Sequence, residues 1–173
     1  MRTYNETQSF DLLRQFLNNK SIWYKSDYLL KYNTYFKMGG NVKFYVLPKN
    51  QQQLIDLFKF CKENEIEYKI IGFTTNILFF DEIEYTLVIS TEFLKDIVIK
   101  KDGISVECGY PLEDFVRIMI IENSIGYEGL EGIPGTIGAG IKMNAGAYGC
   151  QISDQLISVT YLDEDFNIIK LTK

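Results

Sequence analysis

The chain has 173 residues and a formal net charge of −5, with 18 basic and 23 acidic side chains and no histidine. Hydrophobic residues make up 46% of the chain, which excludes disorder as its main state. The basic residues are scattered, so we expect no nucleic-acid partner, because nucleic-acid binding needs a clustered positive surface. Without histidine, Ser-His and Cys-His nucleophiles and histidine-ligated metal sites are excluded.

The cysteines and the N-terminal residues indicate the cellular compartment in which the protein is expected. Cys61, Cys108 and Cys150 are odd in number and widely spaced, so they fit neither a disulfide framework nor a metal site. No apolar run reaches the length of a transmembrane helix, and residues 1–10 contain no apolar signal core. We therefore expect a cytoplasmic protein with no membrane partner and no metal.

The first half of the chain predicts two helices. Apolar residues at helical spacing predict one over Thr7–Asn18 and another over Gln51–Asn64. Between them, the aromatic-rich segment Ser21–Leu30 fits neither pattern clearly. The segment Thr34–Pro48 predicts two strands, because Gly39-Gly40 forms a turn signal between two runs rich in tyrosine and phenylalanine.

The rest of the chain predicts strands around one further helix. Short apolar runs predict strands at Tyr68–Ile71 and Thr86–Ser90. Pro111 fits the first turn of a helix that buries Leu112, Phe115, Val116, Met119 and Ile120. Two hairpins are expected, one of Ile97–Lys100 and Ile104–Cys108 around Lys101-Asp102-Gly103, the other of Ile157–Leu162 and Asn167–Leu171. Helices and strands interleave without a βαβ repeat, which predicts an α+β fold of two small lobes.

The segment Gly132–Gly149 is rich in glycine and carries one charged side chain, Lys142. Glycine permits positive φ and a close approach to the backbone, at a cost in entropy. One explanation is a set of tight turns in a small β domain. The other is a cradle for an anionic ligand, in which backbone N–H groups converge on phosphate oxygens. The segment alone leaves both explanations open.

Three stretches in order carry a family resemblance: "YNTYFKMGG" at 32–40, "IIGFTTNILFFD" at 70–81, and the run from "GYEGLEGIPG" through "NAGAYG" at 126–149. With them the chain resembles the bacterial UDP-N-acetylenolpyruvoylglucosamine reductases from about Lys31 onward. The similarity is to the FAD-binding part of these flavoenzymes, without the C-terminal substrate domain.

The resemblance implies a fold and a cofactor. The expected fold is the α+β, FAD-binding type of p-cresol methylhydroxylase and vanillyl-alcohol oxidase. It would consist of a first FAD-binding subdomain, residues 1–90, and a second, residues 91–173, which carries the glycine-rich loop. The FAD pyrophosphate would lie between the loop after a short strand and the glycine-rich segment. The implied FAD-binding residues are Gly72, Phe73, Thr74, Thr75, Asn76, Ile77, Leu78, Ile133, Pro134, Gly135, Thr136, Gly138, Ala139, Asn144, Gly146, Tyr148 and Gly149.

For some of these residues, and for some others near them, a purely structural role is the alternative to FAD binding or catalysis. Tyr148 would pack inside the protein instead of against the flavin, and Asn144 would cap its own turn, since asparagine readily bonds local backbone. Glu128 matches a family position and is expected to be structural. Cys150 is expected to be a packing residue, and the acidic groups at 82–84 and 163–165 to be solvated loops.

One departure from the family concerns the phosphate loop. The family has Gly-x-Gly-Ser-Asn where this chain has Gly72-Phe73-Thr74-Thr75-Asn76. Thr75 keeps the hydroxyl of serine, but Thr74 replaces a glycine, and a β-branched residue resists positive φ. If the loop needs positive φ there, the strain costs on the order of 1–3 kcal/mol, roughly five- to a hundredfold in FAD affinity.

The second departure concerns catalysis. The family's reductases continue into a Tyr-Arg segment and a substrate domain, with an arginine and a glutamate that stabilise the enol intermediate and a serine that protonates it. No position of this chain matches these three residues, so no catalytic residue is assigned. The family uses NADPH to convert UDP-N-acetylglucosamine enolpyruvate to UDP-N-acetylmuramate in peptidoglycan precursor synthesis.

Three functions follow from these departures. As an enzyme part, the chain would meet NADPH and the UDP-sugar only where a substrate domain is supplied in trans, and alone it would show little or no reductase activity. As a non-catalytic module, it would hold FAD without the family reaction. As a scaffold, it would have lost FAD and would bind protein.

Overall fold

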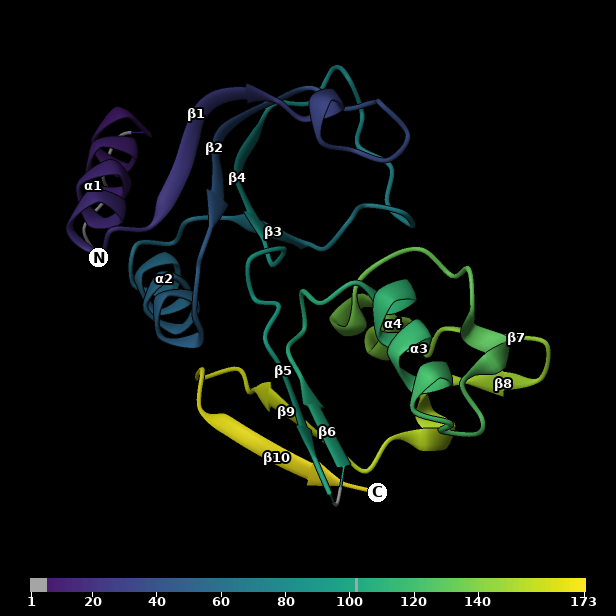
Figure 1. Ribbon diagram of the computed structural model, residues 1–173. Coiled ribbons are helices and arrows are strands. Elements are labelled where there is room, and N and C mark those ends of the chain that lie inside the picture. The colour runs from purple at the N-terminus through teal and green to yellow at the C-terminus, as the bar shows by residue number, and fades with distance from the viewer. Residues whose placement is uncertain (1–5, 102) are drawn as a thin grey trace. The chain divides into compact units, whose positions relative to one another are not determined.

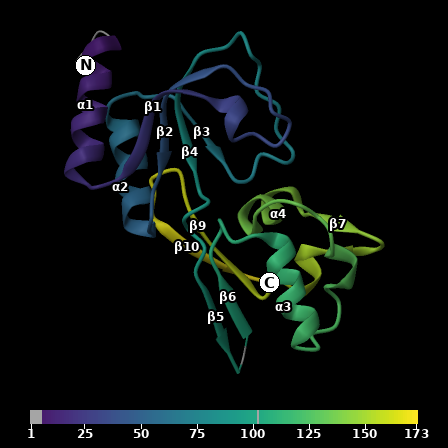
Figure 2. The ribbon, with the colours of Figure 1, turned by 45° about the horizontal axis from the view of Figure 1, so that its top comes forward.

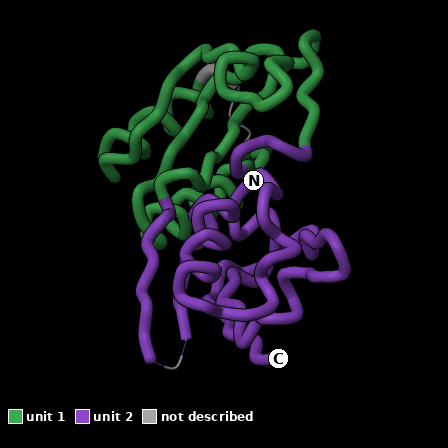
Figure 3. The backbone as a smooth tube through the Cα atoms, turned by 45° about the vertical axis from the view of Figure 1, so that its right-hand side comes forward, with its two compact units in different colours: residues 1–71, 77–93 green, residues 72–76, 94–173 purple. Residues whose placement is uncertain are grey.

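A computed structural model describes residues 6–101 and 103–173 (Figure 1). The chain divides into two compact units (Figure 3). Unit 1 holds the chain up to Ile71 together with Ile77–Phe93, and unit 2 holds Gly72–Asn76 and Leu94–Lys173. The short loop Gly72–Asn76 therefore groups with the second half of the chain, although it follows a strand of the first. The two expected FAD-binding subdomains, 1–90 and 91–173, stay a prediction.

Unit 1 is built on one four-stranded sheet in the order β1-β2-β4-β3. Its strands are β1 (Trp23–Leu29), β2 (Asn41–Leu47), β3 (Tyr68–Ile71) and β4 (Tyr85–Ser90). β1 pairs with β2 in antiparallel orientation, whereas β4 pairs in parallel with both β2 and β3. The two central strands, β2 and β4, are buried along most of their length, as expected for strands covered on both faces.

Two helices, α1 (Glu6–Asn19) and α2 (Gln51–Glu63), complete unit 1 and confirm the helices predicted there. Both lie on the same side of the sheet (Figures 1 and 2). Phe16 of α1 stacks on Phe60 of α2 with ring centroids 4.2 Å apart. The side chain of Asn50 caps α2 by accepting a hydrogen bond from the Gln53 N–H.

The prediction of two strands within Thr34–Pro48 is wrong in its first half. β2 begins at Asn41, and the aromatic run before Gly39 is an irregular loop after a short 3₁₀ helix, Leu30–Tyr32. Local hydrogen bonds replace a ladder there, since the Thr34 hydroxyl donates to the Met38 carbonyl oxygen at 2.6 Å. The antiparallel partner of β2 is instead β1, in the segment whose pattern was ambiguous.

In the part that the structure describes, unit 2 contains three separate two-stranded ribbons. They pair β5 (Ile97–Lys100) with β6 (Gly103–Val106), β7 (Gly146–Ala147) with β8 (Cys150–Gln151), and β9 (Ser158–Leu162) with β10 (Ile168–Thr172). The first and third confirm the two predicted hairpins. The predicted turn of the first includes Asp102, which lies outside the described residues.

The helices of unit 2 surround its core. α3 (Leu112–Ile121) is the predicted third helix, and Pro111 is its N-cap. Leu112, Phe115, Val116 and Met119 of α3 are buried with Leu130 of the short helix η2 (Glu128–Leu130). The prediction that Ile120 is buried with them is wrong, because Ile120 is 42% exposed and lies beside the exposed Arg117 on the helix surface. A further short helix, η3 (Ile152–Gln155), follows β8. No helix within the described ranges is long and apolar enough to cross a membrane.

The glycine-rich segment contains an unpredicted helix, α4 (Ile137–Met143). Thr136 is its N-cap, and the Thr136 hydroxyl accepts a hydrogen bond from the Ala139 N–H. Ile137 is buried in the core of unit 2 and Ile141 packs against the same core. The helix therefore forms through its cap and this burial, despite the poor helix propensity of glycine.

Candidate cofactor site

The loop 72–76 and the glycine-rich segment contact each other inside unit 2. The hydroxyl of Thr75 donates to the Pro134 carbonyl oxygen at 3.1 Å. A Cβ on Gly72 would lie 2.5 Å from Oγ1 of Thr136, and a Cβ on Gly135 would lie 3.2 Å from Oγ1 of Thr75. The two segments that were predicted to flank a pyrophosphate therefore touch where both carry glycine.

Several backbone N–H groups at this contact are available to a ligand. Those of Phe73, Thr75 and Asn76 have no hydrogen-bond acceptor in the part of the chain that the structure describes. The same holds for the N–H groups of Gly135 and Thr136, although both residues are buried. Buried backbone donors are normally paired. Unpaired donors on two touching loops suit a ligand with several anionic oxygens, as a pyrophosphate has.

Other N–H groups of the glycine-rich segment already donate hydrogen bonds within the protein. Those of Ile133, Ile137 and Gly138 donate to the carbonyl oxygens of Leu130, Tyr110 and Cys108 at 3.2, 2.9 and 2.7 Å, respectively. Gly138 also lies close to this neighbour, because a Cβ there would stand 2.8 Å from Cβ of Cys108. This glycine is required by packing, so the cradle explanation does not account for every glycine of the segment.

Thr74 adopts a positive φ, the backbone conformation that is costly for a β-branched residue. Its φ is 57°, in the left-handed region that β-branched residues avoid. The side chain is buried, and its hydroxyl donates to the Phe73 carbonyl oxygen at 2.7 Å. The loop therefore keeps the shape that a glycine would allow, and threonine carries the strain.

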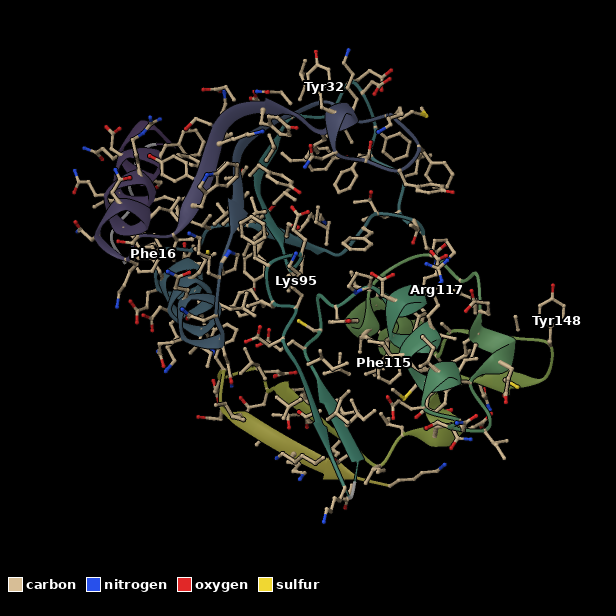
Figure 4. All side chains as sticks on the ribbon, in the orientation of Figure 1. Phe16, Tyr32, Lys95, Phe115, Arg117 and Tyr148 are labelled. Atoms are coloured by element: carbon tan, nitrogen blue, oxygen red, sulfur yellow. The ribbon has the colours of Figure 1, made fainter. Side chains whose placement is uncertain are left out.

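The ribbon β7–β8 holds the last predicted site residues. Tyr148 and Gly149 form its two-residue turn with φ of 51° and 82°, as a type I′ turn requires. Gly146 faces the opposite strand, where a Cβ would lie 2.6 Å from the Cys150 carbonyl oxygen. Tyr148 is 94% exposed and points away from unit 2, so it is not a packing residue of this unit (Figure 4).

Asn144 shows the local role that was the alternative to cofactor binding. It is the C-cap of α4 with φ of 47°. Its side chain donates to Oε1 of Gln151 at 2.7 Å and accepts from the Ser153 N–H at 3.3 Å. Both ends of the amide therefore bind the chain itself.

The two remaining predicted residues, Ile77 and Leu78, belong to unit 1. Ile77 packs against the core cluster of that unit, whereas Leu78 is half exposed. Gly132 was not among the predicted site residues. Its φ is 79°, and a Cβ there would meet no atom within 4 Å.

The titratable groups near the site have structural partners. The Glu128 carboxylate accepts a hydrogen bond from the Gly126 N–H at 2.8 Å, and backbone N–H groups, its own foremost, lower the pKa of this carboxyl. Burial raises the pKa of the Cys108 thiol. No group of three or more Cys, Asp and Glu residues suited to a metal ion occurs within residues 6–101 and 103–173.

The family model described as "FAD binding domain" matches residues 42–172. The chain belongs to this family, and its cofactor is FAD. The site fits this cofactor in its donors, because unpaired backbone N–H groups lie on both of the touching segments and suit the oxygens of a pyrophosphate. Which residues contact FAD stays a prediction.

Comparison with individual proteins supports the same assignment. The chain is 36% identical over 157 residues to the UDP-N-acetylenolpyruvoylglucosamine reductase of Caldicellulosiruptor saccharolyticus, covering 91% of this chain and 51% of the relative. The crystal structure of the corresponding reductase from Thermus caldophilus superposes with a TM-score of 0.67 at 24% identity, covering 87% of this chain and 53% of that one. p-Cresol methylhydroxylase superposes with a TM-score of 0.66 at 14% identity, covering 95% and 35%.

These comparisons confirm the family resemblance and the α+β fold expected from the motifs. Both structures share less than 25% sequence identity with this chain, so the similarity shows a common fold only. The chain spans about half the length of the curated relatives it matches.

Proposed function

We propose that this chain is the FAD-binding half of a UDP-N-acetylenolpyruvoylglucosamine reductase of the cytoplasm. The observation that carries the proposal is the contact between the loop 72–76 and the glycine-rich segment, with unpaired N–H groups on both. The match to reductases over nearly the whole chain supports the choice of this reaction among those of FAD proteins.

The residues of the loop would bind the pyrophosphate. The N–H groups of Phe73, Thr75 and Asn76 would donate to its oxygens from one side, and those of Gly135 and Thr136 from the other. Thr75 would hold the two segments together through its hydrogen bond to Pro134. These groups bind and orient, and they need no change of protonation to do so.

The chemistry itself belongs to the cofactor. When bound, FAD would supply the hydride-transfer chemistry between NADPH and the enolpyruvyl group of the UDP-sugar. The chain supplies the orientation of FAD, and the proton for the product has to come from a group outside the motifs found here. NADPH and the UDP-sugar would therefore bind only together with a substrate domain.

The first experiment is the visible absorbance spectrum of the purified chain, before and after heat release of any chromophore. We expect a flavin spectrum, with the released compound identified as FAD. A colourless protein that takes up no added FAD would contradict the proposal and would favour a scaffold that kept the fold. Turnover of NADPH and UDP-N-acetylglucosamine enolpyruvate by the chain alone would contradict the need for a substrate domain.

A further inference from the structure

Besides Leu78, which is a predicted FAD-binding residue, two loops of unit 1 expose six large apolar side chains. One loop carries Tyr32, Tyr35, Phe36 and Met38, and the other carries Phe80 and Ile83; their exposed fractions lie between 42% and 63%. We call these six residues the aromatic platform. Figure 4 shows Tyr32 on the outside of unit 1. Aromatic residues and methionine are enriched in protein interfaces, and large exposed apolar patches mark interaction sites.

The backbone beneath the platform joins the two loops. The Gly40 N–H donates to the Phe80 carbonyl oxygen at 3.0 Å, and the Gly39 N–H donates to Oδ1 of Asp81 at 2.6 Å. The close approach requires glycine, because a Cβ on Gly40 would lie 2.5 Å from the Asp81 carbonyl oxygen. The platform is therefore presented by a fixed backbone, which lowers the entropy cost of binding a partner.

Other contacts fix the first loop further. The Tyr28 hydroxyl donates to Oδ1 of Asn33, and the Asn33 amide donates to the Tyr45 hydroxyl at 3.4 Å. The rings of Tyr35 and Phe36 meet edge to face with centroids 5.5 Å apart. The first loop is thus held by hydrogen bonds of Asn33 and by packing between two of its exposed rings.

We propose that the platform is the docking surface for the part of the reductase polypeptide that has no counterpart in this chain. This inference rests on the proposed function. About half of the Caldicellulosiruptor saccharolyticus relative lies outside the match, so that half needs a surface on the FAD-binding half. The second platform loop also follows the loop 72–76 directly in the chain, so a partner seated there is linked to the cofactor loop by only a few residues.

The test compares oxidative labelling of the chain alone with that of a fusion. In the fusion, the unmatched half of the Caldicellulosiruptor saccharolyticus reductase is joined to the full chain. We expect labelling of Tyr35, Phe36, Met38 and Phe80 to fall several-fold in the fusion, because interface cores exclude water. Met143 and Tyr161, which are exposed in unit 2, serve as internal controls and should label equally in both proteins.

Each outcome decides a separate point. Equal labelling of the platform in both proteins, with the flavin spectrum intact, would overturn the docking surface and leave the proposed function standing. Loss of the flavin spectrum in both would instead overturn the proposed function.

A second measurement keeps the proposal testable if the fusion does not fold. Light scattering of the chain alone, beside the double variant Phe36→Ser and Phe80→Ser, tests whether a second copy covers the platform. We expect a monomer in both cases, with weaker binding of a hydrophobic dye by the variant. Self-association that the double variant abolishes would assign the platform to a second copy, and unchanged dye binding would show that it is not an accessible apolar surface; either result would overturn the proposal.

Discussion

At Gly40 in unit 1 a Cβ would lie 2.5 Å from the Asp81 carbonyl oxygen, whereas at Gly132 in unit 2 it would meet no atom within 4 Å. The first glycine is required by the protein's own packing. The second is required only by its backbone, which has φ of 79°. Glycines in the motifs therefore have two roles. Some allow two segments of the chain to pack closely, and others leave open space and unpaired N–H groups beside the backbone.

The largest expected effect separates these two glycines directly. Gly40→Ala forces a methyl group onto the backbone of the second platform loop, so we expect it to lower the free energy of unfolding by about 1–3 kcal/mol. Gly132→Ala has open space and meets only the backbone strain of positive φ, so we expect a smaller loss of about 1 kcal/mol. Urea unfolding of both variants measures the difference. An equal or larger loss for Gly132→Ala would contradict the assignment of Gly40, and not Gly132, to the protein's own packing.

A variant of Thr74 tests the loop 72–76, which carries backbone N–H groups without an acceptor among the described residues. Thr74→Gly removes the strain of a β-branched residue at φ of 57°, so we expect FAD affinity to rise about five- to a hundredfold. Titration of FAD into protein stripped of cofactor measures the affinity. Thr75→Gly is the matched control, because Thr75 has no positive φ to relieve and loses its hydrogen bond to Pro134. An unchanged affinity for Thr74→Gly would mean that the loop is already adapted to its ligand.

Thr136 lies between backbone N–H groups without an acceptor in the described part of the chain, including its own, and the hydrogen-bonded N–H groups of Ile137 and Gly138. Thr136→Val removes the acceptor for the Ala139 N–H, so we expect a loss of about 1 kcal/mol in the free energy of unfolding. Thr136→Ser keeps the cap and should retain most of the stability. Urea unfolding of the two variants gives the comparison. Equal stability of the valine and serine variants would show that the cap contributes nothing to α4.

The smallest effect at neutral pH comes from the core of unit 1. Burial raises the pKa of the Cys61 thiol to about 12, above the ordinary value of 9.0. The folded state therefore holds this proton more tightly than the unfolded state. The resulting stability is complete below pH 9 and is lost as the pH rises toward 12.

Cys61→Ala removes this contribution. We expect its free energy of unfolding to fall less steeply with pH over this range than that of the parent chain. Unfolding by urea at a series of pH values measures both slopes, and parallel slopes would contradict the burial of Cys61 as the cause.

The family, the cofactor and the helices α1, α2 and α3 could be predicted from the amino-acid sequence. α1, α2 and α3 follow from apolar residues at helical spacing, which reports the buried face of a helix without knowledge of its partner. The motif at 126–149 specified the family because its spacing is kept. β3 was predicted at Tyr68–Ile71 as a short buried strand; its bounds are confirmed, but only Ile71 of its four residues is buried, because β3 lies at the edge of the sheet.

Strand pairing, α4 and the free donors of the site depend on contacts between distant parts of the chain. The aromatic run at 34–38 has the composition of a strand but no partner strand, because β2 pairs with β1 and β4. α4 was not predicted because its glycines and short length leave few apolar residues at helical spacing. The helix is stabilised by the burial of its isoleucines in unit 2. The loop 72–76 groups with the glycine-rich segment through a contact between residues some 59 positions apart. Hydrogen bonds across such separations depend on how the chain packs, so local patterns cannot say which N–H groups of the site remain free.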